Sequence, residues 1–282
     1  MTDPRNLLAD LLKQARAKGA DAVDLLFMRE ESRQARLRLG KIESVNASET
    51  AQLGLRYFIG KKQAIVATTD FSPAACAELI GRAHHMALLA TEDPFCGLAD
   101  PAQIVRKPPP LDLCDDHDMA ADDLIALARE VEDAALAVPG VTNSEEAEAG
   151  WGRVEVFLLQ SNGFEGHYRR SHNAASVAAV AGQGTGMERD YDYTSAAYRA
   201  DLLPAAEIGR RAGERAVRRL GARKMPTGKM PVMVEPRIAA SFLGHLTSAI
   251  NGANIARGSS FLQHDLGKQI FSPGFTVTDD PH

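Results

Sequence analysis

Hydrophobic and polar residues follow two periods over the first ninety positions. Leucine and alanine recur at helical spacing over 7–15, which predicts an amphipathic helix. Residues 22–28 have the apolar content of a buried strand, and apolar and polar residues alternate over 35–45 and 53–68. With glycine-lysine turns between these segments, the pattern predicts an antiparallel meander. Ser-Pro then opens a second helix at 73–89. We therefore predict an N-terminal α+β domain, a helix/antiparallel-sheet domain at 1–91.

The rest of the chain predicts a second mixed α/β region with β-hairpins and two helices, at 120–282. An acidic, proline-rich linker at 92–119 precedes it, stiffened by the prolines at 108–110. Asn162-Gly163 marks a hairpin turn. After a helix at 120–137 that follows the linker, we expect strands at 154–158, 164–170, 174–181 and 232–235, loops at 182–186 and 187–194, and the two helices at 204–220 and 236–250.

Composition narrows the class of protein. The net charge of −5 over 282 residues does not favour a nucleic-acid binder. No apolar stretch is long enough for a membrane span, and the N-terminus has no signal-peptide pattern. Three widely spaced cysteines, Cys76, Cys96 and Cys114, suit a reducing compartment, so we expect a cytoplasmic location.

No complete catalytic or metal-binding set is recognisable from residue spacing. The acidic run Asp115 to Asp118 precedes a predicted helix and is interpreted as an N-terminal charge bias, not as a metal site. His245 stands alone in an apolar helix, whereas a zinc site on a helix needs two histidines one turn apart. Ser259-Ser260 lacks the G-x-S-x-G context of a hydrolase nucleophile. The Gly182 to Gly186 loop runs into no helix, which argues against a nucleotide fingerprint.

The helix at 204–220 and its exit are strongly basic. We interpret this face as solvated or as a docking surface for an acidic partner, and phosphate binding stays open as an alternative. The eight bases are Arg210, Arg211, Arg215, Arg218, Arg219, Arg223, Lys224 and Lys229.

Several segments, in order along the whole chain, resemble the TldD/PmbA family, closest to the PmbA (TldE) branch. They are Leu159-Gln-Ser-Asn-Gly-Phe164, Met187-Glu-Arg-Asp-Tyr-Asp-Tyr193, Ile208-Gly-Arg-Arg-Ala-Gly-Glu-Arg-Ala216, Pro231-Val-Met-Val-Glu-Pro236 and Phe275-Thr-Val-Thr-Asp-Asp-Pro281. The resemblance implies one subunit of a heteromeric metalloprotease whose TldD-type partner carries zinc on an H-E-x-x-x-H helix. In the comparable helix here, 237–250, no residue corresponds to the motif's first histidine or to its glutamate, and His245 does not replace them. No metal or catalytic role therefore carries over. Relatives of this type continue beyond the Asp-Asp-Pro segment, so we expect the chain to be truncated at the start of the family's C-terminal β-rich domain.

Our hypothesis is a metal-less subunit without cofactor of its own, non-catalytic alone, which binds a TldD-like zinc-bearing subunit and a peptide substrate. The candidate peptide contacts are Arg189, Asp190, Tyr191, Ser259, Ser260 and Phe261. One alternative is a non-enzymatic regulatory protein of the DNA gyrase modulator type, acting through the basic helix. Another is a metallopeptidase whose ligands are not recognisable from spacing.

Overall fold

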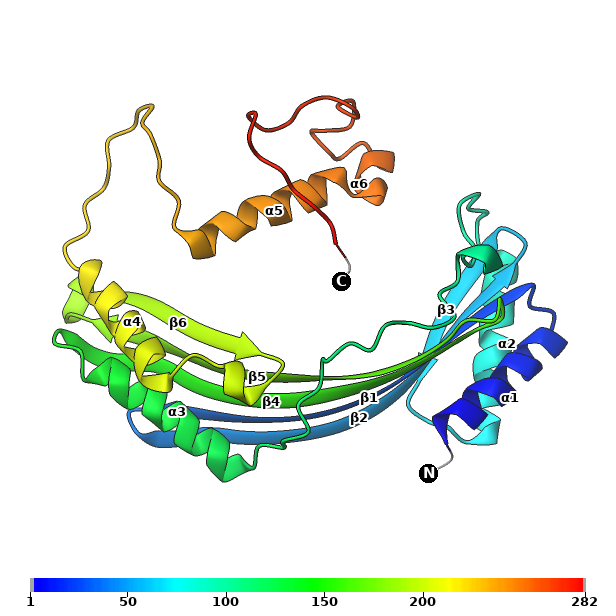
Figure 1. Cartoon of the computed structure of the whole chain (residues 1–282), viewed down its shortest axis with the longest axis horizontal. Coiled ribbons are helices and arrows are strands. Elements are labelled where there is room, and N and C mark those ends of the chain that lie inside the picture. Colours follow the sequence, from blue (N-terminus) through cyan, green and yellow to red (C-terminus); the bar gives the residue numbers. More distant parts are fainter. Residues whose placement is uncertain (1–2, 281–282) are drawn as a thin grey trace. The chain divides into compact units, whose positions relative to one another are not determined.

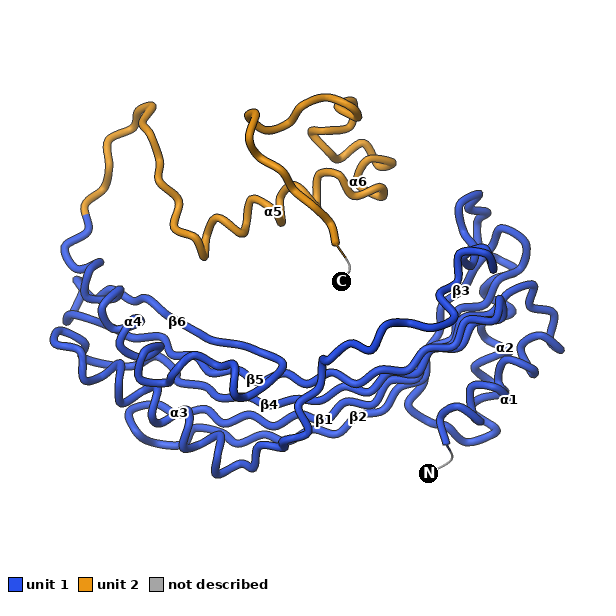
Figure 2. Tube along the Cα trace, in the orientation of Figure 1, with its two compact units in different colours: residues 1–222 blue, residues 223–282 orange. Residues whose placement is uncertain are grey.

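The computed structural model describes residues 3–280, which fall into two compact units, Met1–Ala222 and Arg223–His282 (Figure 2). The first unit contains all the strands among the described residues. Its elements are α1 (Pro4–Ala17), β1 (Ala22–Arg38), β2 (Lys41–Ile59), β3 (Lys62–Thr68), α2 (Pro73–Leu89), α3 (Ala121–Leu136), β4 (Val141–Gln160), β5 (Glu165–Ala181), β6 (Glu188–Ala196) and α4 (Ala205–Arg218). Single 3-10 turns occur at Pro101–Gln103, Gly184–Gly186 and Arg199–Asp201.

One antiparallel six-stranded sheet, in the order β3-β2-β1-β4-β5-β6, organises the first unit. The pairing of β1 with β4 joins the N-terminal meander to the later hairpin, so that Phe27 lies opposite Leu53 on one side and Phe157 on the other. The α+β class and the antiparallel meander are thus confirmed. The ranges 1–91, 92–119 and 120–282 stay a prediction, and the sheet runs across them without interruption.

The helices pack on one face of this curved sheet, in two pairs (Figure 1). At one end, α1 and α2 cover the residues of β1 that include Val23, Leu25 and Phe27. Ala35 and Leu37, on the same face farther along β1, lie in a core with Trp151 and α3. Because side chains alternate across a strand, the odd-numbered positions of β1 form this helix-bearing face.

A third core, made mainly of small residues, joins α3 and α4 to β5. Alanines of β5 pack on Ile208 and Ala212 of α4 and on Val131 of α3. Gly209 and Gly213 lie where the two helices meet; a Cβ on Gly209 would be 2.2 Å from the carbonyl oxygen of Val131. The helix predicted over 204–220 therefore has a packed face made of glycine and alanine.

A buried carboxylate fixes the turn between β1 and β2. Glu132 of α3 is fully buried and accepts hydrogen bonds from the backbone N–H groups of Leu39 and Gly40, both at 2.7 Å, and from the hydroxyl of Ser144. Leu39 and Gly40 have φ angles of 49° and 72°, as a tight turn between twisted strands requires. Burying the charge is tolerable because several donors satisfy it.

The acidic run interpreted as a charge bias on the following helix has a different role, so that interpretation is wrong. Asp122 and Asp123 occupy the first turn of α3. Asp118 instead pairs with Arg153 at 2.5 Å, and Asp116 lies 3.4 Å from Arg169. The segment thus crosses the gap between the two helix pairs, where β4 and β5 present arginines that a helix does not cover.

Asp115 in this segment should make its anchoring dependent on pH. It accepts the backbone N–H groups of Arg199 and His117, and these hydrogen bonds hold the pKa of its carboxyl below the ordinary value. A carboxyl whose pKa is lowered on folding stabilises the fold above its unfolded pKa, and this contribution is lost as pH falls through the lower folded value. We expect the Arg199 amide to lose protection from hydrogen exchange in acid, as measured by NMR. Asp115→Asn should remove this pH dependence; an unchanged profile would contradict the assignment.

Two other predictions from the sequence are wrong. The segment 187–194, interpreted as a loop, belongs from Glu188 onward to the edge strand β6, which pairs with β5 from Ala181↔Glu188 to Asn173↔Ala196. Residues 232–235 form no strand, because the described part of the second unit, 223–280, contains no other strand to pair with. That unit contains α5 (Pro236–Ile250), as predicted, and the short α6 (Gly252–Ala256).

Candidate functional site

The sheet face opposite the helices is the candidate functional surface of the first unit. Within residues 3–222, all four long helices pack on the sheet face that the odd-numbered positions of β1 share, so the face of the even-numbered positions is not covered by a helix. Leu26 and Ser32 of β1 and Tyr168 of β5 lie on this open face, as their strand register shows. An antiparallel sheet with one face left open is a common platform for binding.

The edge strand β6 divides its side chains between the two faces. Asp190, Asp192 and Thr194 are buried on the helix-bearing face. Tyr191 and Tyr193 alternate with them on the open face, 47% and 54% exposed, with their rings stacked at 6.4 Å between centroids. The strand thus presents an aromatic pair at the edge of the sheet.

The arginines of α4 neutralise the buried acids of β6. Arg211 and Arg215 each lie 2.8 Å from the carboxylate of Asp192, and Arg219 lies 3.3 Å from that of Asp190. Arg211 Nε lies close to Asp192 Oδ2 but makes no hydrogen bond with it, so this contact is an ion pair only. Of the eight bases expected to be solvated or to dock an acidic partner, Arg211, Arg215 and Arg219 therefore pair with acids inside the unit.

The candidate peptide contacts lie in two places. Arg189 and Tyr191 are on the open face of β6, where Arg189 pairs with Glu145, whereas Asp190 points to the opposite face. Ser259, Ser260 and Phe261 lie in the second unit and line, with His245, a hollow of 420 Å³. The hydroxyls of both serines donate to backbone carbonyls, at Asn254 and Ala249, so neither is poised as a nucleophile.

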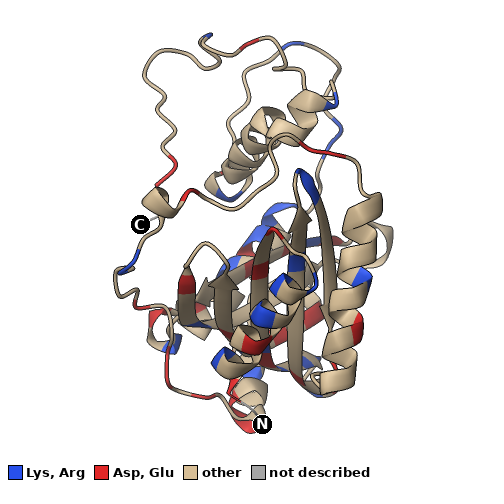
Figure 3. Cartoon of the chain, turned by 90° about the vertical axis from the view of Figure 1, so that its right-hand side faces the viewer, with Lys and Arg blue, Asp and Glu red and all other residues tan. Residues whose placement is uncertain are grey.

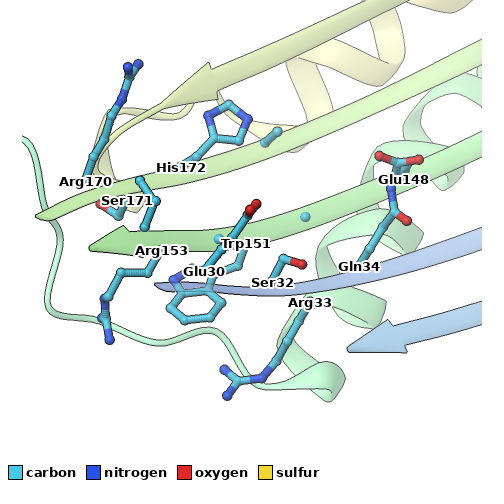
Figure 4. A pocket seen from close by; sticks show the side chains of 14 residues that line it. Glu30, Ser32, Arg33, Gln34, Glu148, Trp151, Arg153, Arg170, Ser171 and His172 are labelled. Atoms are coloured by element: carbon cyan, nitrogen blue, oxygen red, sulfur yellow. The ribbon is translucent and has the colours of Figure 1, made fainter. Parts of the chain in front are cut away.

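A second feature of the open face is a hollow of 460 Å³ over the middle of β4 (Figure 4). Its floor is the backbone of Gly150 and Gly152, whose partners in the neighbouring strands are Gln34 and Ala174, and Ser32 and His172. In the next row, Glu30 and Arg170 lie on either side of Val154. In Figure 4 the side chains of Arg170 and His172 rise from β5, while Trp151 and Arg33 lie below the sheet.

The charges around this hollow are mostly uncompensated. Glu148 at its rim pairs with Arg36 at 2.9 Å. In the described chain, the side chains of Glu30, Arg170 and His172 make no hydrogen bond or ion pair. The hollow was not predicted from the sequence. The signal for it was the pair of glycines at alternate positions of the strand, Gly150 and Gly152, because glycine in a strand often marks a place where another backbone or a ligand approaches closely.

Within residues 3–280, no three histidine, cysteine or carboxylate side chains come together as metal ligands. In α5, His245 lines a hollow with serine, alanine, asparagine and phenylalanine residues, which do not supply the donor set that zinc requires. No helix in the described range has the length and apolar content of a membrane span.

Comparison with protein families matches three consecutive family domains. Residues 23–87 match domain 1 of the PmbA/TldA metallopeptidases, residues 114–220 their central domain, and residues 227–282 their C-terminal domain. The two halves of the open sheet, the meander and the β4–β6 hairpin region, thus correspond to different family domains that share one sheet.

Relatives and solved structures agree with this match. The metalloprotease PmbA of Escherichia coli O157:H7 is 33% identical over 248 residues, which are 87% of this chain and 55% of the relative, and the PmbA homologue of Haemophilus influenzae is 29% identical over 87% of this chain and 54% of its own. The chain spans about half the length of these curated relatives. A Bacteroides thetaiotaomicron protein, described as a candidate modulator of DNA gyrase, superposes with a TM-score of 0.86 at 24% identity over 95% of this chain and 62% of that one. TldE from Thermococcus kodakarensis superposes with a TM-score of 0.63 at 18% identity, over 75% and 47%. The fold, the three matched domains and the relatives together place this chain in the PmbA/TldD metallopeptidase family.

Proposed function

We propose that this chain is a metal-less, PmbA/TldE-like subunit that holds extended peptides for a zinc-bearing, TldD-like partner. The observation that carries the proposal is the position of β6 at the edge of the sheet, with its exposed pair Tyr191 and Tyr193. The family assignment supports the protease context, and the names of the relatives support the metalloprotease link. Three free cysteines suit a cytoplasmic setting for this work.

A sheet edge can hold a peptide without reading its sequence. The backbone groups on the outer side of an edge strand pair with any extended chain. β6 is nine residues long, from Glu188 to Ala196. At Tyr191 the backbone N–H donates to Asp190 Oδ1 and the carbonyl accepts from Arg215, so an added strand would displace these two contacts. Every second side chain of an added strand would lie on the open face beside Tyr191 and Tyr193, whose rings favour apolar or aromatic neighbours across the ladder.

The test is peptide cleavage by the reconstituted pair of this chain and a TldD-like partner. Tyr191→Ala with Tyr193→Ala should lower cleavage about tenfold, equivalent to about 1.4 kcal/mol of lost binding. Tyr168→Ala is the matched control, because Tyr168 is 50% exposed on the open face but belongs to β5 rather than to the edge strand. A peptide N-methylated at alternate residues, which cannot complete a strand ladder, should also be cleaved poorly. Cleavage that is unaffected by omitting this chain or by the double substitution would refute the proposal.

The DNA gyrase modulator alternative makes a different prediction. Arg211 and Arg215 are occupied by Asp192, and basic and acidic residues are interspersed on the elements visible in Figure 3. We therefore expect weak binding to duplex DNA without a steep dependence on salt. Replacing Arg211 and Arg215 with glutamine should destabilise the fold more than it changes DNA affinity, as compared by urea unfolding and fluorescence anisotropy. A steep salt dependence that disappears in this variant would instead favour the regulatory role.

A further inference from the structure

The glycine-floored hollow on the open face has the features of a small binding site. It has a volume of 460 Å³ and lies over the backbone of Gly150 and Gly152, where the absence of side chains leaves the sheet accessible. A Cβ at Gly150 would meet only the carbonyl oxygen of Arg33, at 3.8 Å, so a larger residue would fill the hollow without straining the strand. The glycines therefore leave space that the fold itself does not require.

Opposite charges stand on the two sides of this space. Arg170, with His172 two residues along β5, provides the positive side, and Glu30 of β1 provides the negative side. Glu148 does not add a free negative charge, because Arg36 neutralises it. Ser32 and Gln34 follow Glu30 along β1, beside the floor glycines, and contribute uncharged hydrogen-bonding groups.

The spacing of the charges suits a short peptide with free ends. Arg170 and Glu30 are both register partners of Val154, so their strands are two intervals apart, or about 10 Å at roughly 4.8 Å per strand. An extended chain advances about 3.3 Å per residue, so three residues also span about 10 Å. A terminal carboxylate suits a guanidinium, and a terminal ammonium suits a carboxylate.

We infer that this hollow binds zwitterionic short peptides, of about three residues, with the C-terminal carboxylate at Arg170 and His172 and the N-terminal ammonium at Glu30. Ser32 and Gln34 meet the peptide's backbone amides. Such peptides are what proteolysis releases, but the inference stands on the hollow itself and does not require the role proposed for β6.

The site can be tested by calorimetric titration of the chain with tri-alanine, N-acetyl-tri-alanine and tri-alanine amide. Tri-alanine should bind, and blocking either terminus should weaken binding about tenfold. In the Glu30→Gln variant, acetylation of the peptide should no longer weaken binding, whereas amidation still should. In the Arg170→Gln variant, amidation should no longer weaken binding, whereas acetylation still should.

Two further variants separate loss of the site from loss of the fold. Gly150→Val should abolish peptide binding while the chain keeps its unfolding midpoint, because valine suits a strand and the space is open. The Tyr191→Ala/Tyr193→Ala variant should bind tri-alanine like the unmodified chain, so failure of the β6 proposal and failure of this one are distinguishable. Equal affinity for the free and blocked peptides, no binding at millimolar tri-alanine, or full binding by the folded Gly150→Val variant would each overturn the inference.

Discussion

Gly209→Ala is expected to lower the free energy of unfolding of the Met1–Ala222 unit by about 2 kcal/mol. The new methyl group would lie 2.2 Å from the carbonyl oxygen of Val131 and 2.8 Å from the backbone nitrogen of Ala135, so α3 and α4 would have to separate. Overpacking of this kind costs up to about 3 kcal/mol, and the better helix propensity of alanine returns at most about 1 kcal/mol. Urea unfolding followed by the fluorescence of Trp151, which lies in this unit, measures the change.

The matched control is Gly81→Ala in α2. Gly81 also lies inside a helix, but no atom of another part of the chain lies within 4 Å of the point where the added methyl group would stand. This substitution should raise the free energy of unfolding by up to about 1 kcal/mol. Two substitutions of the same chemistry should therefore have opposite signs; a neutral or stabilising Gly209→Ala would contradict the close packing of α3 on α4.

Glu132→Ala is expected to lower the free energy of unfolding by about 3 kcal/mol. It removes the acceptor shared by the Leu39 and Gly40 N–H groups and the Ser144 hydroxyl, and each buried donor left unsatisfied costs about 1–3 kcal/mol. Glu132→Gln, which retains one carbonyl oxygen, should lose roughly half as much. The same urea experiment measures both.

Glu130→Ala serves as the control for helix α3. Glu130 is exposed, so its replacement should change the free energy of unfolding by less than about 0.5 kcal/mol. If Glu130→Ala and Glu132→Ala were equally mild, the carboxylate of Glu132 would not be what fixes the β1–β2 turn.

Hydrophobic periodicity predicted the ends of the long strands better than their middles. Around Val23 to Phe27 and at Leu37, apolar side chains face the helices and make these parts of β1 recognisable as strand. Between them, Arg29, Glu31 and Arg33 face the gap between the helix pairs, so this part of β1 is polar on both faces. A strand without a buried apolar face shows no alternation of apolar and polar residues, so this pattern cannot predict it.

Strand β6 was missed for the opposite reason. Its buried positions are acidic and its exposed ones aromatic, which inverts the usual pattern. The inversion is stable because Arg211 and Arg215 reach Asp192 from a helix that follows later in the chain. The basic helix and the acidic strand were each visible in the sequence, but their pairing is a tertiary contact that neither segment specifies alone.

The pairing of β1 with β4 also determines how long β1 stays unpaired on one side while the ribosome makes the chain. Asp24 pairs with Arg56 on one side and with Gln160 on the other. One edge of β1 can therefore pair with β2 early in synthesis, whereas its other edge stays unpaired until more than a hundred further residues have been made. At about 5–20 residues per second, a ribosome needs roughly 5–20 seconds to supply them. During that interval β1 is a temporary outer strand, open to pairing with another nascent chain. The charged run from Arg29 to Arg33 lies in the middle of β1 and adds little to either core. Its charges would disfavour pairing of the open edge with another chain until β4 emerges from the ribosome.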